Sequence, residues 1–460
     1  MINKTYIMPH PPIIVHEVGR GREKEAQLTI EGCQRAARGV SAEKPDTIVI
    51  ISPHGPSYSN VVCIAGDSLL KGDFGSFGSK KLSYEFQNDL ALAASISGEL
   101  EKFGIDSVTN NEKAQKEYGI DPSIDHGALV PLYFVQKEYR DFQLVHLATA
   151  IPDPETLYKC GMAIQAAAAV SNKKIVLIAS SDLSHRLTDD GPYEYNPEGA
   201  KYDNFVVECI KEKTFSSFMN VNGYMRESAG ECGHRAINIA LGIFEGQTCE
   251  TEVYSYEGPF GVGYMVAELK LKDSGRSVLE EYRNIRERKI IESRKSESAY
   301  VQLARKTIEL YIETGKKYKT ENISAERKAT FVSIKKHGIL RGCIGTIHPT
   351  KDCVENEIIG NAIEAATKDP RFPPIEEYEL KDLTISVDIL YPPEKINSQS
   401  MLDVKEYGVI VSKGMKRGLL LPNLEGIDTI DRQIEIALDK GGIRHNENYS
   451  LERFKVVRYK

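Results

Sequence analysis

The sequence predicts an α/β domain followed by a smaller α+β domain. Strand-like apolar runs alternate with segments of helical periodicity in residues 1–272, and a second alternation occupies residues 295–460. The length of 460 residues also exceeds the roughly 250 to 300 residues that one hydrophobic core usually serves. Because alternating strands and helices are typical of a sheet flanked by helices, we expect this architecture in the first domain.

The elements of the first domain follow one another in chain order. Runs rich in β-branched and aromatic residues predict strands at 46–54, 60–66, 142–148, 174–181 and 253–258. Apolar residues at helical spacing predict helices at 25–40, 85–104, 154–171 and 235–246.

Residues 273–294 separate the two domains. This segment carries many charges of both signs and few large apolar side chains, which indicates a linker or a solvated helix. In the second domain the same patterns predict helices at 299–315, 353–368 and 430–443. They predict strands at 329–338, 339–347, 383–393, 408–413 and 453–459.

The composition excludes several classes of protein. A net charge of −7 offers no basic surface for nucleic acid. No apolar run approaches the roughly 20 residues of a membrane helix, and the N-terminus lacks the pattern of a secretory signal. The eight cysteines are scattered without CxxC pairs, which fits a reducing compartment. We therefore expect a cytoplasmic protein that binds neither nucleic acid nor membrane, and a homo-oligomer is compatible with these features.

Residue types that bind metals occur where apolar strands give way to turns. They are His10, His54, Asp182 and His185, together with the cluster Glu231, Cys232 and His234. In open α/β sheets ligands bind beyond the carboxyl ends of the strands, where side chains distant in sequence can meet. Prolines beside His10 and His54 restrict the backbone, which reduces the entropy lost when a ligand is fixed.

This pattern favours a metal site over a set of unrelated turn residues. Two imidazoles and one carboxylate leave coordination positions on iron(II) open for substrate and dioxygen. A single histidine after a strand is more often a turn residue, and Asp182 could cap a helix that starts at Leu183. Several such residues at strand ends of one domain nevertheless favour a shared site.

Five motifs carry a family resemblance across the first 270 residues. MPHPP, SPHGP, IDHGALVPLYF, SSDLSH and GECGHRAI occur in this order, and the segment resembles the class III extradiol dioxygenases and their relatives, the Memo proteins. The resemblance implies an iron(II) ion held by His10, His54 and a third ligand. The sequence leaves that ligand open, because Glu231 matches the dioxygenase carboxylate and Cys232 matches the cysteine of the Memo branch. A thiolate would favour copper or zinc, or would alter the properties of iron.

The same resemblance assigns roles to the remaining residues. His185 is expected to act as acid and base on a dihydroxylated aromatic substrate, with Asp182 as its neighbour. Imidazole suits this role because it titrates near neutral pH. His126, in the DHG motif, corresponds to a second active-site histidine that contacts the substrate or the oxygen intermediate.

ILRGCIGTI is the most distinctive motif of the second domain. With DPRFPPI, LTISVDIL and RGLLLPN it resembles the domain of the AMME chromosomal region family over roughly 295–460. Arg341 offers a guanidinium to an anion, and Gly342 and Gly345 around Cys343 allow a substrate or partner to approach the backbone. Alternatively, the glycines serve strand packing and Cys343 is a small buried residue.

Together the two halves resemble the AmmeMemoRadiSam arrangement, in which these domains are encoded with a radical-SAM protein. This implies a radical-SAM partner, and the chain itself contains no CxxxCxxC motif for the iron–sulfur cluster. Two alternatives stand beside an oxidoreductase that acts on a small aromatic or heteroaromatic compound. One is a Memo-type binding or signalling module without oxygen chemistry, and the other is an adaptor that binds a small molecule, peptide or nucleotide through residues 295–460.

Overall fold

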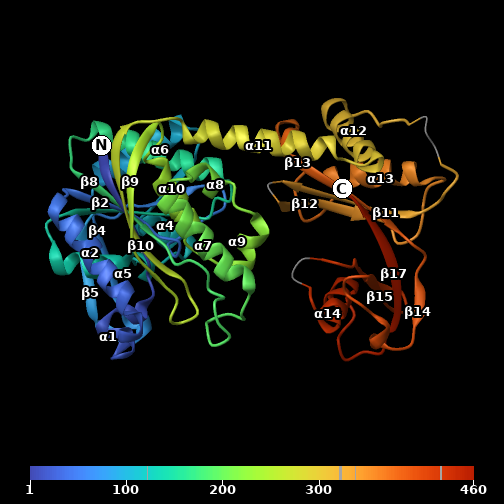
Figure 1. Cartoon of the computed structure of the whole chain (residues 1–460), viewed down its shortest axis with the longest axis horizontal. Helices are drawn as coiled ribbons and strands as arrows, with labels where there is room; N and C mark the ends of the chain where they lie inside the picture. The colour runs from blue at the N-terminus through green and yellow to red at the C-terminus, as the bar shows by residue number, and fades with distance from the viewer. Residues whose placement is uncertain (122, 321–323, 337, 425–426) are drawn as a thin grey trace. The chain divides into compact units, whose positions relative to one another are not determined.

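The computed structural model describes residues 1–121, 123–320, 324–336, 338–424 and 427–460. The chain divides into two compact units, Met1–Ile285 and Arg286–Lys460 (Figure 1). Helix α11 (Val278–Lys295) contains most of the charged segment that we expected to be a linker or a solvated helix. His337, in the predicted strand 329–338, lies outside the described residues.

An eight-stranded sheet forms the centre of unit 1, in the order β6-β3-β7-β2-β8-β1-β10-β9. Four central strands are parallel: β7 (Gln143–Thr149), β2 (Thr47–Ile51), β8 (Ile175–Ser180) and β1 (Ile2–Met8). The outer strands are β6 (Ser107–Asn110), β3 (Val62–Ala65), β10 (Tyr264–Ser274) and β9 (Gln247–Glu257). Since parallel strands place their carboxyl ends at one edge, residues that follow β1, β2 and β8 are neighbours.

Helices cover both faces of this sheet and create two cores. The helices on one face are α2 (Gln27–Glu43) and α5 (His126–Glu138). Those on the other face are α3 (Leu90–Lys102), α6 (Pro154–Val170), α7 (Pro197–Glu212) and α10 (His234–Gly242). Alternate residues of β2 enter the two cores, Ile48 and Ile50 on the first face and Val49 and Ile51 on the second. Burial on both faces explains why the central strands are apolar throughout.

Residues 85–104 were predicted to form one helix, and this prediction is wrong at its start. Strand β5 (Ser79–Gln87) pairs instead with β4 (Leu69–Phe74) in a hairpin. Helix α3 begins after Asp89, whose carboxylate accepts a hydrogen bond from the Leu92 N–H at 3.1 Å. The cap at Asp89 therefore fixes the start of α3, after the end of β5 at Gln87. The other helices of unit 1 are α1 (His16–Gly19), α4 (Glu112–Tyr118), α8 (Phe215–Met219) and α9 (Gly223–Ala229).

Unit 2 combines an antiparallel sheet with helices, so the predicted α+β class is confirmed. The strand order is β12 (Ile339–Gly345), β11 (Ala329–Lys336), β13 (Leu383–Leu390), β17 (Ser450–Tyr459), β15 (Tyr407–Lys413) and β16 (Lys416–Leu420), with β14 (Glu394–Ile396) paired to β17. The helices are α12 (Ala299–Thr314), α13 (Val354–Thr367) and α14 (Ile430–Gly441). Helices α12 and α13 pack against β11 and β13, and α14 packs against β15 and β16.

No helix in the described parts of either unit combines the length and the apolar character of a membrane span.

Candidate metal centre

The parallel strands of unit 1 carry three histidines to one edge of the sheet. His10 follows β1, His54 follows β2 and His185 follows β8, and these strands are adjacent in the order β2-β8-β1. The crevice beyond the carboxyl ends of such strands is the usual ligand site of an open α/β sheet. The arrangement therefore brings together residues that are far apart in the sequence.

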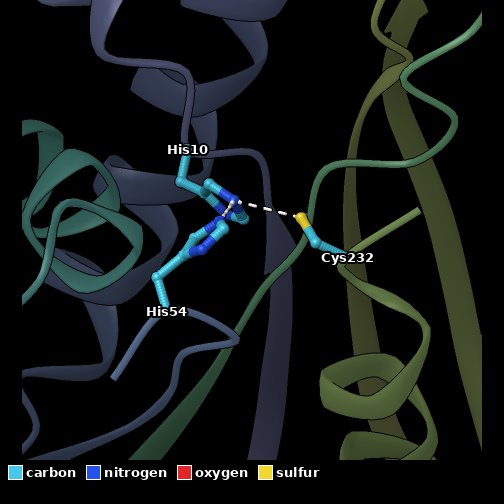
Figure 2. Close-up of side chains that lie close together, drawn as sticks. All are labelled: His10, His54 and Cys232. Atoms are coloured by element: carbon cyan, nitrogen blue, oxygen red, sulfur yellow. Dashed lines mark hydrogen bonds between the residues drawn. The ribbon is translucent and has the colours of Figure 1, made fainter. Parts of the chain in front are cut away.

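His10, His54 and Cys232 form a compact set of metal-binding side chains. The His10 Nε2 atom lies 3.0 Å from His54 Nε2 and 3.4 Å from Cys232 Sγ. All three ligand atoms lie within 4.8 Å of one another. Figure 2 shows the two imidazole rings converging and the sulfur pointing toward His10. Two nitrogens and one sulfur at this separation suit a metal ion that keeps further coordination positions open.

The hydrogen bonds of His10 turn its free lone pair toward this set. The Ser180 hydroxyl donates to the Gly127 carbonyl, so its oxygen accepts a hydrogen bond from His10 Nδ1 at 2.8 Å. The proton of a neutral His10 is then on Nδ1, and Nε2 is free to bind a metal. Burial holds the pKa of His10 well below its usual range, and the neighbouring His54 lowers it further. Neutral imidazole is the form that binds metals.

His54 lies on the solvent-exposed side of the set. Although the residue is exposed, desolvation by the surrounding groups lowers the pKa of His54, and the nearby His126 lowers it too. Both imidazoles are therefore neutral at pH 7, and the set is accessible to an entering ion from this side.

Cys232 approaches the two histidines from the turn before α10. A Cβ on Gly233 would lie 2.0 Å from the Ser181 hydroxyl, so the glycine allows this turn to approach the strand end closely. Burial raises the pKa of the Cys232 thiol well above its usual range, and the carboxylates of Asp182 and Glu231 raise it further. A coordinated cation would reverse this balance, because a metal-bound thiol loses its proton.

Glu231 is not part of the convergent set, which contains Cys232, so the structure favours Cys232 as the third ligand. Its Oε2 accepts a hydrogen bond from the His234 N–H at 2.6 Å, and its Oε1 lies 3.8 Å from Arg226 Nε. The carboxylate therefore caps the start of α10. This geometry does not fit the glutamate alternative that the sequence left open.

His234 is a core residue. Its ring is fully buried, stacks on Phe218 with centroids 4.2 Å apart, and its Nδ1 lies 3.0 Å from the Tyr202 hydroxyl. These contacts place His234 outside the His-His-Cys set, and its buried Nε2 has no hydrogen-bond partner in the described structure.

His185 lies next to the sulfur with a defined protonation. Its Nδ1 lies 2.5 Å from the Gly230 carbonyl oxygen, which can only accept, so this nitrogen carries the proton. Its Nε2 lies 3.8 Å from Cys232 Sγ. Burial lowers the pKa of His185, so Nε2 is free to accept a proton at neutral pH.

Asp182 holds the His10 turn in place. Its Oδ1 accepts a hydrogen bond from the His10 N–H at 2.7 Å, and its Oδ2 lies 3.7 Å from His10 Nε2. Burial raises the pKa of Asp182 to about 7. The backbone after it is not helical, so the alternative role as a cap for a helix starting at Leu183 is wrong.

His126 begins α5 and stacks on His54, with ring centroids 4.4 Å apart. The preceding Asp125 accepts a 2.5 Å hydrogen bond from Ser52 and lies 3.1 Å from His146 Nε2. Burial acts to raise the pKa of Asp125, but the His146 and Ser52 contacts outweigh it and hold that pKa well below its usual range. This network was not predicted from the sequence, although an imidazole within the apolar run FQLVHLA is a signal for it.

Two aromatic rings lie beside His126 and His185, the histidines outside the His-His-Cys set, and neither ring was predicted from the sequence. The Phe77 ring lies 5.2 Å from the His126 ring, and the exposed Tyr193 ring lies 5.7 Å from the His185 ring. Aromatic side chains around a few polar groups are typical of pockets for small organic molecules.

In unit 2, the expectation of a free guanidinium at Arg341 is wrong. Its Nη2 lies 2.8 Å from Glu379 Oε2, and its Nη1 donates to the Pro373 carbonyl at 2.7 Å. Its Nη2 also donates to the Pro374 carbonyl at 3.1 Å, so the Arg341 donors are held by groups of the protein itself. Lys336 Nζ lies 3.0 Å from the same Glu379 carboxylate, which is therefore shared by two cations.

The two glycines of the motif are explained by packing. A Cβ on Gly342 would lie 2.2 Å from the Ala365 carbonyl oxygen, and one on Gly345 would lie 2.2 Å from the Phe331 ring. Cys343 between them is half-buried, and its Sγ lies 3.2 Å from the Ser333 hydroxyl. The glycines therefore fit the packing alternative, whereas Cys343 is not enclosed in a core.

Two family models match the chain. Residues 4–267 match the family described as the catalytic LigB subunit of aromatic ring-opening dioxygenase, and residues 301–460 match the AMMECR1 family. Protein CA_C1420 of Clostridium acetobutylicum is 40% identical over 465 residues, which cover 100% of this chain and 99% of that protein. A protein of Thermotoga maritima is 48% identical over 171 residues, which cover 36% of this chain and 98% of that protein.

Two solved structures are also similar. Uncharacterized protein PH0010 from Pyrococcus horikoshii is 30% identical, covers 35% of this chain and 88% of its own, and has a TM-score of 0.33. Uncharacterized protein JW3007 from Escherichia coli K12 is 14% identical, covers 58% of this chain and 99% of its own, and has a TM-score of 0.41.

Proposed function

Because the chain belongs to the family of the catalytic LigB subunit of aromatic ring-opening dioxygenase and continues into an AMMECR1 domain, we propose that unit 1 is a metal-dependent oxidoreductase. Its substrate is a small aromatic or heteroaromatic compound. The observation that carries this proposal is the convergence of His10 Nε2, His54 Nε2 and Cys232 Sγ within 4.8 Å.

We propose iron(II) as the resident ion, with copper or zinc as alternatives. The open positions around two imidazoles and a thiolate support iron, while the softness of the sulfur supports copper or zinc. When bound, a redox-active metal would supply the exchange of electrons between substrate and oxygen that ring opening requires. His10, His54 and Cys232 would hold it.

His185 is the proposed acid and base. Its Nδ1–H donates a hydrogen bond to the Gly230 carbonyl, so its Nε2 can take a proton from a substrate hydroxyl and later return it. Cys232 Sγ, 3.8 Å from that nitrogen, brings the base next to the metal ligands. The His126 ring lies 4.4 Å from the His54 ring and 5.8 Å from the His10 ring, so His126 would contact the substrate.

Phe77 and Tyr193 support the aromatic substrate class. Each ring lies beside one of the two proposed substrate histidines, His126 and His185. Aromatic faces bind planar rings in offset or edge-to-face geometry, which adds about 0.5 to 1.5 kcal/mol per pair to the burial of area.

The second candidate is a Memo-type binding module that lacks oxygen chemistry. Cys232 favours it, because a thiolate takes the place of the carboxylate in the two-histidine, one-carboxylate set of non-haem iron oxygenases. In either case we propose that a radical-SAM protein is the working partner, which the fusion of the two domains supports. Cross-linking of the full chain to a radical-SAM protein of the same organism tests this partnership, and failure to form a complex contradicts it.

Turnover under air tests the oxidoreductase directly. Anaerobically purified protein loaded with iron(II) is mixed with a panel of catechols and heteroaromatic diols, and ring-cleavage product is followed by its visible absorbance. We expect turnover by the wild type and a loss of about 10²- to 10⁴-fold in His185→Gln at unchanged iron content. If the iron-loaded wild type forms no ring-cleavage product from any compound of the panel, this result contradicts the oxidoreductase and favours the binding module.

A further inference from the structure

The start of α5 packs closely against the turn that carries His54. A Cβ on Gly127 would lie 2.4 Å from the Ser52 Oγ atom and 3.3 Å from His54 Cδ2. These distances leave no room for a side chain at position 127, so glycine allows the backbone of α5 to approach Ser52 and His54. The position of α5 and the position of His54 therefore depend on each other.

Asp125 joins these two elements through hydrogen bonds. Its Oδ1 accepts from the Ser52 hydroxyl at 2.5 Å and from the Ala128 N–H at 3.3 Å. The first bond reaches the turn after β2, and the second caps the amino end of α5. The Ser52 oxygen in turn accepts a hydrogen bond from the His54 N–H at 3.3 Å. A continuous path of hydrogen bonds thus runs from the Asp125 carboxylate to the backbone of His54.

The other carboxylate oxygen of Asp125 is fixed on β7. Its Oδ2 lies 3.1 Å from Nε2 of the buried His146. A Cβ on Gly55 would lie 3.1 Å from His146 Cε1 and 3.3 Å from the same Oδ2. The Asp125 carboxylate is therefore enclosed between a core histidine and the residue that follows His54, and contacts at both oxygens set its orientation.

The first turn of α5 also reaches the second histidine of the metal set. The Gly127 carbonyl accepts a hydrogen bond from the Ser180 hydroxyl, whose oxygen accepts from His10 Nδ1 at 2.8 Å. One short segment of chain thus holds His54 through the side chain of Asp125 and His10 through the carbonyl of Gly127. Fixing this segment fixes the separation of the two imidazoles.

We propose that Asp125 is a positioning residue of the metal centre, which holds His54 in place for the ion through Ser52. The proposal rests on the assignment of His10, His54 and Cys232 as ligands in the proposed function. Asp125 is not a member of that set, so it acts through its neighbours. A turn that is already fixed loses less entropy when it binds an ion, and the ion is bound more tightly.

Asp89 provides a matched control for the structural part of this role. It caps α3 by accepting from the Leu92 N–H at 3.1 Å, and it accepts from the Thr47 hydroxyl at 2.6 Å. Its carboxylate also contacts a basic side chain, that of Lys173, at 2.6 Å. Thr47 begins β2, whereas His54 follows the end of β2. Asp89 therefore makes the same kinds of contact as Asp125, but at the opposite end of the strand.

Zinc affinity of the full-length protein, measured by anaerobic calorimetric titration, tests the proposal. We expect Asp125→Ala to lower this affinity about 10- to 100-fold. Asp125→Asn should retain most of the affinity, because an amide oxygen can still accept from the Ser52 hydroxyl and the Ala128 N–H. Asp89→Ala should lower the unfolding temperature, as the loss of a helix cap does, and leave zinc affinity unchanged.

Ser52→Ala is the second variant of this test. It removes the link between Asp125 and His54 but keeps the cap of α5, so it is informative even if Asp125→Ala does not fold. We expect zinc affinity to fall in Ser52→Ala as well. Because both residues act along one path, the double variant should lose no more affinity than Asp125→Ala alone.

Three results would overturn the proposal. They are wild-type zinc affinity in Ser52→Ala and Asp125→Ala, a loss in Asp125→Asn equal to that in Asp125→Ala, and an equal loss in Asp89→Ala. The last result would show that zinc affinity only follows the stability of unit 1. Zinc binding requires neither substrate nor oxygen, so a protein without ring-cleavage activity that shows the expected affinities supports the role of Asp125 and contradicts only the oxidoreductase.

Discussion

His185 Nε2 lies 3.8 Å from Cys232 Sγ, and the Nδ1 atom of the same ring is held by the Gly230 carbonyl at 2.5 Å. The Nε2 atom of His185, which carries no proton, therefore lies beside the Cys232 thiol, which burial keeps protonated. Binding of a cation would release the thiol proton toward this base, which couples metal binding to a proton acceptor already in place.

Loss of the Ser180 hydroxyl should weaken metal binding through His10. In Ser180→Ala nothing holds the proton on His10 Nδ1, so Nε2 is the free nitrogen for only part of the time. We expect zinc affinity, measured by anaerobic calorimetric titration, to fall about 10- to 100-fold. Ser181→Ala is the matched control, because the buried Ser181 hydroxyl has no hydrogen-bond partner in the described structure. Equal zinc affinities of the two variants would show that the Ser180 hydrogen bond does not affect metal binding by His10.

Cys232 and Glu231 should respond differently to substitution. Cys232→Ser removes a direct ligand, so we expect zinc affinity to fall by at least about 100-fold. Glu231→Gln keeps an oxygen that can accept from the His234 N–H and should retain metal near the wild-type stoichiometry. Elemental analysis after anaerobic gel filtration measures both. Loss of the metal in Glu231→Gln but not in Cys232→Ser would instead identify Glu231 as the third ligand.

Gly342→Ala should destabilise unit 2. The new Cβ would lie 2.2 Å from the Ala365 carbonyl, so the strand and α13 must separate, at a cost of about 1 to 3 kcal/mol in the free energy of unfolding. Gly360→Ala in α13 is the control, since its Cβ meets only Lys351 Cε at 3.6 Å and alanine favours a helix. Scanning calorimetry of the full chain measures both variants. An unchanged transition in Gly342→Ala would remove the packing explanation.

The stability of unit 1 should depend on pH through Asp203. Burial raises the pKa of Asp203 to about 7, where its carboxyl group contacts the Ser184 N–H and the Tyr256 hydroxyl, both at 2.8 Å. In the unfolded chain an aspartate titrates near pH 3.9, so between about pH 4 and 7 only the folded state keeps the proton. This contribution to stability is fully present below pH 4 and is lost as pH rises to 7.

Asp203→Asn removes this dependence. From pH 5 to 7 the wild type should lose about 1.4 kcal/mol per pH unit relative to the variant, as measured by urea denaturation at several pH values. A constant difference between the two proteins over this range would show that Asp203 keeps an ordinary pKa in the fold.

The fold classes and the edge of the sheet that bears the histidines could be predicted from the sequence. His10, His54 and His185 follow apolar runs, and parallel strands must place such residues at one edge. Contacts between distant segments could not be read in this way. The contacts of Asp125 with His146 and of Phe77 with His126 depend on how loops return to the sheet. In the sequence, neither residue of a pair indicates its partner.

The sequence also could not show which of two adjacent residues on a turn faces the candidate metal centre. Glu231 and Cys232 are neighbours, and the backbone of the turn alone decides which side chain faces His10. Arg341 is a third case. Its guanidinium was expected to be available to an anion, but it pairs with Glu379, which lies far along the chain on a different element.

X-ray absorption at the zinc edge of the anaerobically loaded full-length protein tests most directly whether His10, His54 and Cys232 hold one ion. We expect one sulfur at about 2.3 Å and imidazole nitrogens at about 2.0 to 2.1 Å, with the sulfur absent in Cys232→Ser and present in Glu231→Gln. A spectrum without sulfur in the wild type, or one that Cys232→Ser leaves unchanged, would contradict it.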